Sequence, residues 1–172
     1  NDNALAVLRD IPGLILACPS DGAEAAQMLR ECHRLAREEN RLCVFLEPIA
    51  LYPIRDVQVG DRAWMRTYPA PDQRIPFGQV GVDGDGDLAI VTFGNGRYLT
   101  AAAAIKDVRI IDVRWLAPLP LKSLLDALKG AKHILVVDET RRSGGIAEGV
   151  MTALFEAGHR NIARYTAEDS FI

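Results

Sequence analysis

The sequence predicts an α/β protein: a three-layer α/β/α domain with a mostly parallel sheet, preceded by a partial β-α-β piece of a second α/β domain. From residue 88 onward, short apolar runs alternate with segments whose apolar residues recur at helical spacing. Such alternation with short turns favours parallel strands that are covered by helices on both faces. The first fifty residues hold one further strand–helix–strand unit, and two strands cannot form an independent core.

The opening unit has clear boundaries in the sequence. Residues 14–18 form a short apolar strand candidate that Pro19 stops. Asp21 can cap a helix that runs to about Glu39, with Glu24 three residues later reaching back. Residues 42–46 give the second strand. We therefore expect residues 1–52 to be the tail of a domain whose beginning lies outside this chain.

Residues 53–86 read as a long connector, rich in proline and glycine and with little apolar periodicity. Trp64, Met65 and Tyr68 indicate that it packs against the rest of the molecule. The run 83–87, Asp-Gly-Asp-Gly-Asp, resembles the start of a calcium loop, which needs glycine at its sixth position and glutamate at its twelfth. Those positions hold Leu88 and Gly94, so a calcium loop is excluded.

Residues 87–172 carry the regular alternation. The expected strands are 88–93, 108–113, 134–137 and 161–165. The expected helices follow Gly94-Asn95-Gly96, span Leu121 to Leu128 before Gly130, and span Ile146 to Leu154 before Gly158. This pattern makes residues 87–172 one small domain.

Composition excludes several classes of protein. The chain has 172 residues, 49% hydrophobic and 25% charged, with a net charge of −3, which is ordinary for a globular protein. Its largest basic cluster, Arg141-Arg142, is too small for a nucleic-acid footprint. No apolar run approaches the ~20 residues of a membrane helix, and no secretory signal opens the chain. The three cysteines lack metal-ligand spacing and fit the core of a reduced, cytosolic protein.

Polar residues cluster where the strand 134–137 ends and the next helix begins. Such a turn lies at the carboxyl edge of a parallel sheet, where ligands and partners commonly bind. A glycine pair at a helix start can receive an anion, although close packing is the more common reason for it. We assign this turn to partner or interdomain contacts through six residues: Asp138, Glu139, Arg141, Arg142, Gly144 and Gly145.

The residue types do not assemble a complete active site. After Gly94 and Gly96, the dinucleotide fingerprint needs a third glycine where Leu99 stands. A Gly-Lys-Ser/Thr phosphate loop and a nucleophile elbow are both missing. His133 begins a predicted strand and His159 follows the glycine that ends a predicted helix, so both are expected at the periphery of the domain. No catalytic, cofactor-binding or metal-binding residue is therefore assigned, and chemistry alone favours a binding or assembly domain.

The ordered set of segments nevertheless resembles a known family, the thiamine-diphosphate-dependent 2-oxo acid dehydrogenases of the β-chain type, which are transketolase-like. Residues 11–20, Val44-Phe-Leu-Glu-Pro48 and Leu51-Tyr52 resemble the end of that family's pyrimidine-binding domain. The family's carboxyl-terminal domain is similar to residues 88–94, 113–119, 135–139 and 143–146, and its closing segment to residues 166–171.

The resemblance implies that a longer parent protein uses thiamine diphosphate and Mg²⁺ to decarboxylate a 2-oxo acid oxidatively and to pass the acyl group to a lipoyl domain. The family's catalytic glutamate lies upstream of Asn1, and its Gly-Asp-Gly…Asn-Asn metal motif belongs to another domain or chain. Gly84-Asp85-Gly86 echoes that motif without its asparagines and is interpreted as a turn. This chain alone is thus expected to be inactive and to bind neither cofactor.

The implied partners are a second copy or an α/β assembly, and the dihydrolipoyl acyltransferase core of a multienzyme complex, in the cytoplasm or, for a eukaryote, the mitochondrial matrix. Two alternatives stay open. One is a fragment of transketolase or deoxyxylulose-phosphate synthase. The other is a non-enzymatic α/β regulatory module that holds an anion at one of the glycine turns.

Overall fold

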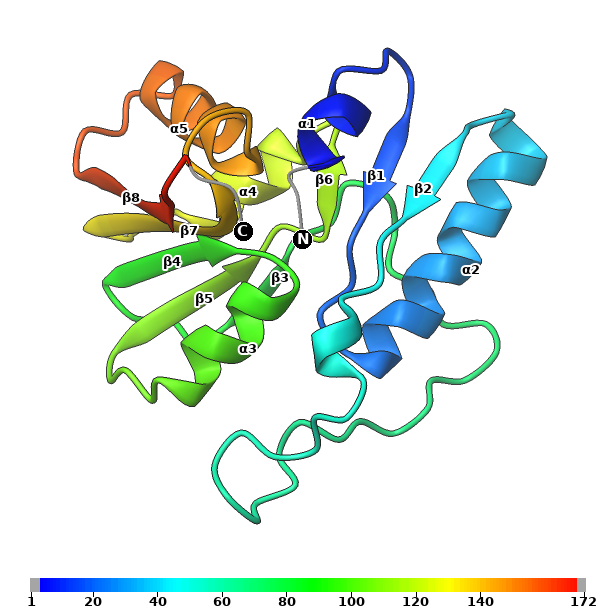
Figure 1. The fold of residues 1–172 in the computed structure, drawn as a ribbon, viewed down its shortest axis with the longest axis horizontal. Helices are drawn as coiled ribbons and strands as arrows, with labels where there is room; N and C mark the ends of the chain where they lie inside the picture. The colour runs from blue at the N-terminus through cyan, green and yellow to red at the C-terminus, as the bar shows by residue number, and fades with distance from the viewer. Residues whose placement is uncertain (1–3, 170–172) are drawn as a thin grey trace.

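The computed structural model describes residues 4–169 and contains two sheets. A three-stranded sheet has the order β2-β1-β6, and a five-stranded sheet has the order β3-β5-β4-β7-β8. Figure 1 shows the two sheets side by side, each with its own helices. We call the part around the first sheet the N-terminal lobe and the part around the second sheet the C-terminal lobe. The predicted α/β class is confirmed.

The N-terminal lobe contains the predicted strand–helix–strand unit. Its elements are α1 (Ala4–Arg9), β1 (Ile15–Ala17), α2 (Gly22–Glu39), β2 (Cys43–Phe45) and the 3-10 turn Ile49–Leu51. β1 and β2 are parallel. Met28, Cys32 and Leu35 lie on one stripe of α2 and are buried against β1. The short helix α1 has no counterpart in the sequence prediction.

A third strand reaches this lobe from the distant part of the chain. β6 (Trp115–Ala117) pairs antiparallel with β1. It follows β5 of the other sheet after Arg114, whose positive φ of 58° turns the chain. Trp115 is fully buried beneath α2. The sequence analysis did not predict this strand, because an arginine gives no local signal for a left-handed turn.

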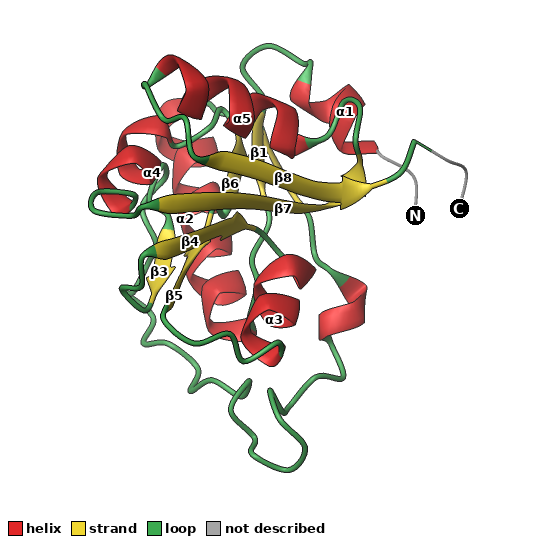
Figure 2. Ribbon diagram, turned by 90° about the vertical axis from the view of Figure 1, so that its left-hand side faces the viewer, coloured by secondary structure: helices red, strands yellow, loops and turns green. Residues whose placement is uncertain are grey.

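The C-terminal lobe has the predicted three layers. Its strands are β3 (Gly81–Asp83), β4 (Leu88–Thr92), β5 (Val108–Asp112), β7 (His133–Arg141) and β8 (Ile162–Ala167). Its helices are α3 (Asn95–Ala102), α4 (Leu121–Ala127) and α5 (Ile146–Glu156). All strand pairs are parallel except β3 with β5. Figure 2 shows α3 on one face of the sheet and α4 and α5 on the other.

The core of this lobe follows from side-chain alternation along parallel strands that are buried on both faces. Ala89 and Val91 of β4 join Val136 of β7 on the face that α4 and α5 cover. Leu124 of α4 and Val150 of α5 close that layer. At about 25 cal/mol per Å² of apolar area removed from water, this continuous layer is the main favourable contribution to folding.

Most of the predicted connector, residues 53–86, lacks regular structure, but it includes β3 (Gly81–Asp83), which the sequence analysis did not predict. The connector is anchored at several further points. Trp64 is buried and meets Tyr98 of α3 edge-on, with ring centroids 5.2 Å apart. Ile75 and Phe77 pack with the core beneath α2. Met65 and Tyr68 remain exposed. The connector therefore contacts both lobes, as its aromatic content predicts, while its middle loops away from them (Figure 1).

Candidate functional site

The predicted contact turn, residues 138–145, joins β7 to α5 and is organised around a buried carboxylate. Asp138 is 3% exposed. Its Oδ1 accepts hydrogen bonds from the amide and the hydroxyl of Thr140, both at 2.8 Å. Its Oδ2 accepts a hydrogen bond from the amide of Ala147, also at 2.8 Å. Asp138 thus satisfies one of the free amides at the start of α5 and holds the turn from within.

The glycine pair in this turn has a packing explanation. A Cβ on Gly145 would lie 2.5 Å from the Thr140 hydroxyl and 2.9 Å from the Asp138 carboxylate. Gly144 has a positive φ of 75°, which an L side chain rarely adopts. Both glycines are therefore required by the way the turn closes on Asp138. This supports close packing, the more common of the two interpretations of the glycine pair, over anion binding.

A second glycine turn, 94–96, lies at the same sheet edge because β4 and β7 are parallel neighbours. The Asn95 amide donates to both carboxylate oxygens of Glu139, at 2.9 and 3.1 Å. A side chain on Gly96 would collide with Thr92, so this glycine too serves close packing. Glu139 thus places a carboxylate beside the start of α3, a position at which the helix dipole favours negative charge.

The remaining predicted residues make their described contacts within the chain. Arg9 of α1 donates to the Gly145 carbonyl and lies 3.7 Å from Glu148. The Arg142 carbonyl accepts a hydrogen bond from Arg164 at 3.2 Å, while the Arg142 side chain is exposed and that of Arg141 is half-buried. Partner contacts through Glu139, Arg141 and Arg142 stay a prediction.

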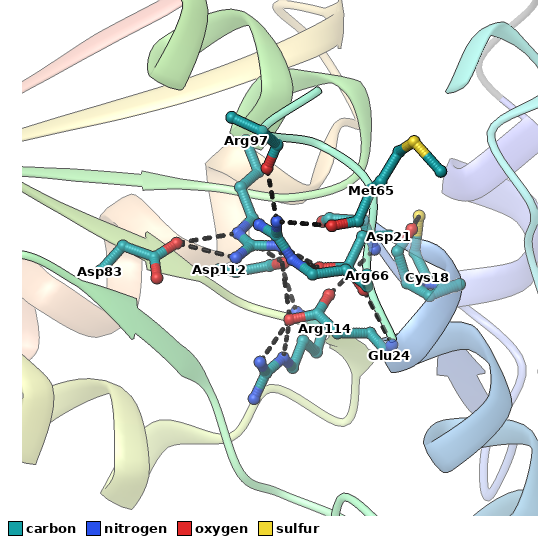
Figure 3. Close-up of polar contacts among 12 residues, drawn as sticks. Cys18, Asp21, Glu24, Met65, Arg66, Asp83, Arg97, Asp112 and Arg114 are labelled. Atoms are coloured by element: carbon teal, nitrogen blue, oxygen red, sulfur yellow. Dashed lines mark hydrogen bonds and ion pairs between the residues drawn. The ribbon is translucent and has the colours of Figure 1, made fainter. Parts of the chain in front are cut away.

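A denser polar site, which the sequence analysis missed, lies between the two lobes. We call it the interlobe charge cluster. Figure 3 shows its side chains converging from α2, α3, β3, the end of β5 and the connector. Five members are largely buried and two lie at its rim. They are Asp21, Glu24, Arg97, Asp112 and Arg114 inside, and Arg66 and Asp83 at the rim.

Arg97 of α3 is the centre of the cluster, with a side chain only 8% exposed. Its Nη1 lies 3.0 Å from Asp21 and 3.5 Å from Glu24, both at the start of α2. Its Nη2 lies 2.8 Å from Asp83 of β3. One guanidinium, which presents five donors in a rigid fork, thus ties the C-terminal lobe to the N-terminal lobe.

The start of α2 supplies two acids because it is capped as predicted. The amide of Glu24 donates to Asp21 at 2.9 Å, and the amide of Ser20 donates to Glu24 at 3.1 Å. Burial acts to raise the pKa of Asp21, but the Glu24 amide and the nearby Arg97 and Arg66 hold that pKa below its usual range. Arg114 donates to Glu24 through Nε at 3.0 Å and through Nη2.

Asp112 behaves differently from the other buried acids. It is 1% exposed, and its Oδ2 has no hydrogen bond from any described residue. Burial, together with the nearby charge of Glu24, raises its pKa to about 8. The neutral form of Asp112 is therefore favoured near neutral pH, although Arg97, whose Nε lies 3.9 Å away, acts in the opposite sense. The buried part of the cluster then holds two carboxylates, Asp21 and Glu24, against two guanidinium groups, and its charge balances.

The connector covers the cluster. Arg97 and Arg66 lie 5.3 and 5.5 Å from the ring centroid of Trp64, within cation–π range. Beside them a cavity of about 400 Å³ opens at the carboxyl ends of β1 and β2. Its walls come from the start of α2, residues 47–54 and residues 64–66, and are mainly apolar. Asp21 and Arg66 are the two cluster residues that line this mainly apolar cavity.

The chemistry of the site is that of an ionic connection between lobes. Cys18 beside it is a poor nucleophile because burial and neighbouring acids raise the pKa of its thiol. Among residues 4–169, no three His, Cys, Asp or Glu side chains gather as a metal site. His133 is exposed, in keeping with the predicted periphery, whereas His159 is half-buried. No helix in the same range has the length and apolar character needed to span a bilayer.

The turn 84–86 does not fit a diphosphate–metal site. A side chain on Gly84 or Gly86 would overlap the backbone of residues 107 and 108. The carbonyl of Asp85 accepts a hydrogen bond from Arg109 at 2.9 Å. The glycines therefore allow a close crossing over the start of β5, which fits the interpretation of residues 84–86 as a turn.

Sequence comparison matches residues 78–170 to the family model "Transketolase, C-terminal domain". A 1-deoxy-D-xylulose-5-phosphate synthase of Acidovorax ebreus is 31% identical over 98% of this chain and 25% of its own length. The acetoin:2,6-dichlorophenolindophenol oxidoreductase subunit beta of Cupriavidus necator is 31% identical, over 81% of this chain and 39% of its own. The pyruvate dehydrogenase E1 component subunit beta of Staphylococcus aureus is 26% identical, over 90% and 46%.

Among solved structures, a split-gene transketolase, described as an inactive beta4 tetramer, matches 96% of this chain and 52% of its own with a TM-score of 0.65 and 21% identity. That likeness concerns the fold alone. The chain spans between a quarter and about half of the length of these curated relatives.

Proposed function

The chain belongs to the transketolase C-terminal domain family, and from this premise we propose that it is the carboxyl-terminal part of a thiamine-diphosphate-dependent 2-oxo acid dehydrogenase component of the β-chain type. Its own role is mainly subunit assembly. The parent protein decarboxylates a 2-oxo acid oxidatively and passes the acyl group to a lipoyl domain, with the chemistry supplied by thiamine diphosphate and Mg²⁺.

The observation that carries this proposal is the match to two β subunits, together with the dehydrogenase-like residues Glu47-Pro48 and Leu51-Tyr52. The similarity covers 81% and 90% of the chain, so it extends beyond the family domain, which matches residues 78–170. The interlobe charge cluster joins the two lobes. Within the run from Glu47-Pro48 to Leu51-Tyr52, the Tyr52 hydroxyl donates a hydrogen bond to the Glu47 carboxylate.

Assembly fits this chain better than catalysis. Asp138 and Glu139 at the sheet edge accept hydrogen bonds within the chain, and a Cβ on Gly96 or Gly145 would collide with neighbouring side chains. We propose that the residues that hold the diphosphate and the metal belong to another domain or chain. The partners would be a second copy or an α subunit, and the dihydrolipoyl acyltransferase core of a complex.

A second candidate is a deoxyxylulose-phosphate synthase, because the similarity to that enzyme spans 98% of the chain. The two functions differ in what consumes the product of decarboxylation. The parent protein is to be assayed with pyruvate and branched 2-oxo acids for carbon dioxide release. Release that needs ferricyanide or a lipoyl domain supports the dehydrogenase, whereas release that needs glyceraldehyde 3-phosphate supports the synthase.

Calorimetry tests whether the cofactor site lies outside this chain. We expect the chain of residues 1–172 to give no binding heat with thiamine diphosphate and Mg²⁺, while the parent protein binds both. Tight binding by this chain alone would contradict the assignment of the cofactor site to another part.

A further inference from the structure

The outer face of α2 carries a groove that several arginines line. The groove has a volume of about 630 Å³ and lies between α2 and residues 68–74 of the connector. Figure 1 shows these two segments running side by side, away from the C-terminal lobe. Five cationic or titratable basic side chains line it against one acid: Arg30, His33, Arg34, Arg37 and Arg74, with Glu38.

Two of these arginines are already engaged. Arg34 lies 2.7 Å from Glu31, 2.8 Å from Glu39 and 3.3 Å from Glu38, so its charge is compensated. Arg30 donates to the carbonyl oxygens of residues 69, 70 and 73 and lies 5.4 Å from the ring centroid of Tyr68. Arg30 thus fixes the connector wall of the groove, and carbonyl oxygens leave its positive charge uncompensated.

Two further arginines are available for an external ligand. Arg37 and Arg74 are exposed, and neither makes a hydrogen bond or an ion pair among residues 4–169, although Arg74 is near enough to Glu31 to help lower the pKa of that carboxyl. Between them the floor is apolar, with Leu29 53% exposed, and Tyr68 at the rim is 76% exposed. Glu31, Glu38 and Glu39 are gathered on Arg34, so the groove is not strongly charged overall. It does present two exposed cations beside an apolar floor.

We propose that this groove docks an acidic, extended segment of a partner protein, with carboxylates on Arg37 and Arg74 and an apolar side chain on Leu29. The groove is open and its charges sit on the ends of long exposed side chains. Such a surface suits several spaced contacts along a peptide, whereas a small anion is held by enclosed, buried donors. The proposal does not depend on the reaction of the parent protein.

The test titrates the 172-residue chain into a labelled twelve-residue peptide of aspartate and glutamate with one central leucine. Fluorescence anisotropy of the label measures binding. We expect saturable binding that weakens by about tenfold between 50 and 500 mM salt, because exposed charge pairs are screened. The double substitution Arg37→Glu/Arg74→Glu should weaken binding at least about tenfold, because repulsion replaces attraction. The milder Arg37→Gln/Arg74→Gln should weaken it less, and circular dichroism checks that both variants fold.

Lys106→Glu is the matched control, since it reverses one exposed charge in the C-terminal lobe. It should leave peptide affinity within about twofold. Absent binding, or equal binding by the arginine variants, would overturn the proposal. So would equal affinity for a neutral peptide of the same length. If ATP bound in an arginine-dependent manner while the peptide did not, the groove would be a phosphate site instead.

Discussion

The β7–α5 turn and the interlobe charge cluster are both rich in acids and arginines, yet they are built in opposite ways. The turn comes from one continuous stretch, and its buried Asp138 is satisfied by amides and a hydroxyl close in sequence. The cluster gathers charges from both lobes and the connector, and contacts such as Arg114 with Glu24 join residues 90 apart. The turn organises one helix start, whereas the cluster fixes the position of one lobe against the other.

The largest difference between the two regions should appear when Arg97 is removed. Arg97→Ala leaves Asp21 and Glu24 buried without their common partner, so we expect a loss of about 3–5 kcal/mol in the free energy of unfolding. Asp83→Ala, at the exposed rim, should cost less than about 1 kcal/mol. Urea unfolding measures both. Equal losses of unfolding free energy for Arg97→Ala and Asp83→Ala would show that the buried ion pairs contribute no more to stability than a surface ion pair.

The cluster should also make stability depend on pH in an unusual direction. The pKa of Asp112 is about 8 in the folded chain and about 4 when unfolded. Between these values only the folded state holds the proton, so stability falls as pH rises, by up to about 1.4 kcal/mol per pH unit. Asp21, whose pKa is lowered, acts in the opposite sense but below about pH 4.

Asp112→Asn removes this titration while keeping the shape of the side chain. Thermal unfolding of both proteins at pH 5 and pH 7.5 gives the measurement. We expect the native chain to lose more stability over this interval than the variant, by roughly 2–3 kcal/mol. Parallel pH profiles for the two proteins would mean that Asp112 is ionised in the folded state.

The stability of the β7–α5 turn should depend on side-chain volume at its glycines rather than on its charges. Gly145→Ala inserts a methyl group against the Thr140 hydroxyl and the Asp138 carboxylate, and should cost about 1–3 kcal/mol. Gly22→Ala at the start of α2 is the matched control, because a Cβ there meets nothing within 4 Å. The control should be neutral or slightly stabilising. A neutral Gly145→Ala in the same denaturation assay would remove the packing explanation.

The smallest effect on folding is expected at the arginines of the turn. Arg141→Ala/Arg142→Ala should change the free energy of unfolding by less than about 1 kcal/mol. Sedimentation velocity of the parent protein should nevertheless show weaker association, if these side chains contact a partner. Unchanged association would disprove that role and leave the turn with a purely internal one.

The same contrast explains how much the sequence could predict. The strands around Leu16 and Val91, the capped helix from Asp21 and the packed turn after Val137 all have local signatures in periodicity and capping. The charge cluster has none, since its members are dispersed and each alone reads as a surface residue. The strand at Trp115 was missed for a similar reason, because it pairs with β1 across the molecule.

That strand has a consequence for how the molecule holds together. β6 is part of the family domain by sequence, yet its backbone hydrogen bonds and Trp115 belong to the core around β1 and α2. The two lobes therefore cannot separate without breaking a sheet, and they should melt in one cooperative transition. The family domain, residues 78–170, is therefore not expected to fold as a unit separate from the N-terminal lobe. Expressing it alone would remove β1 from β6, and would leave the N-terminal lobe without its third strand.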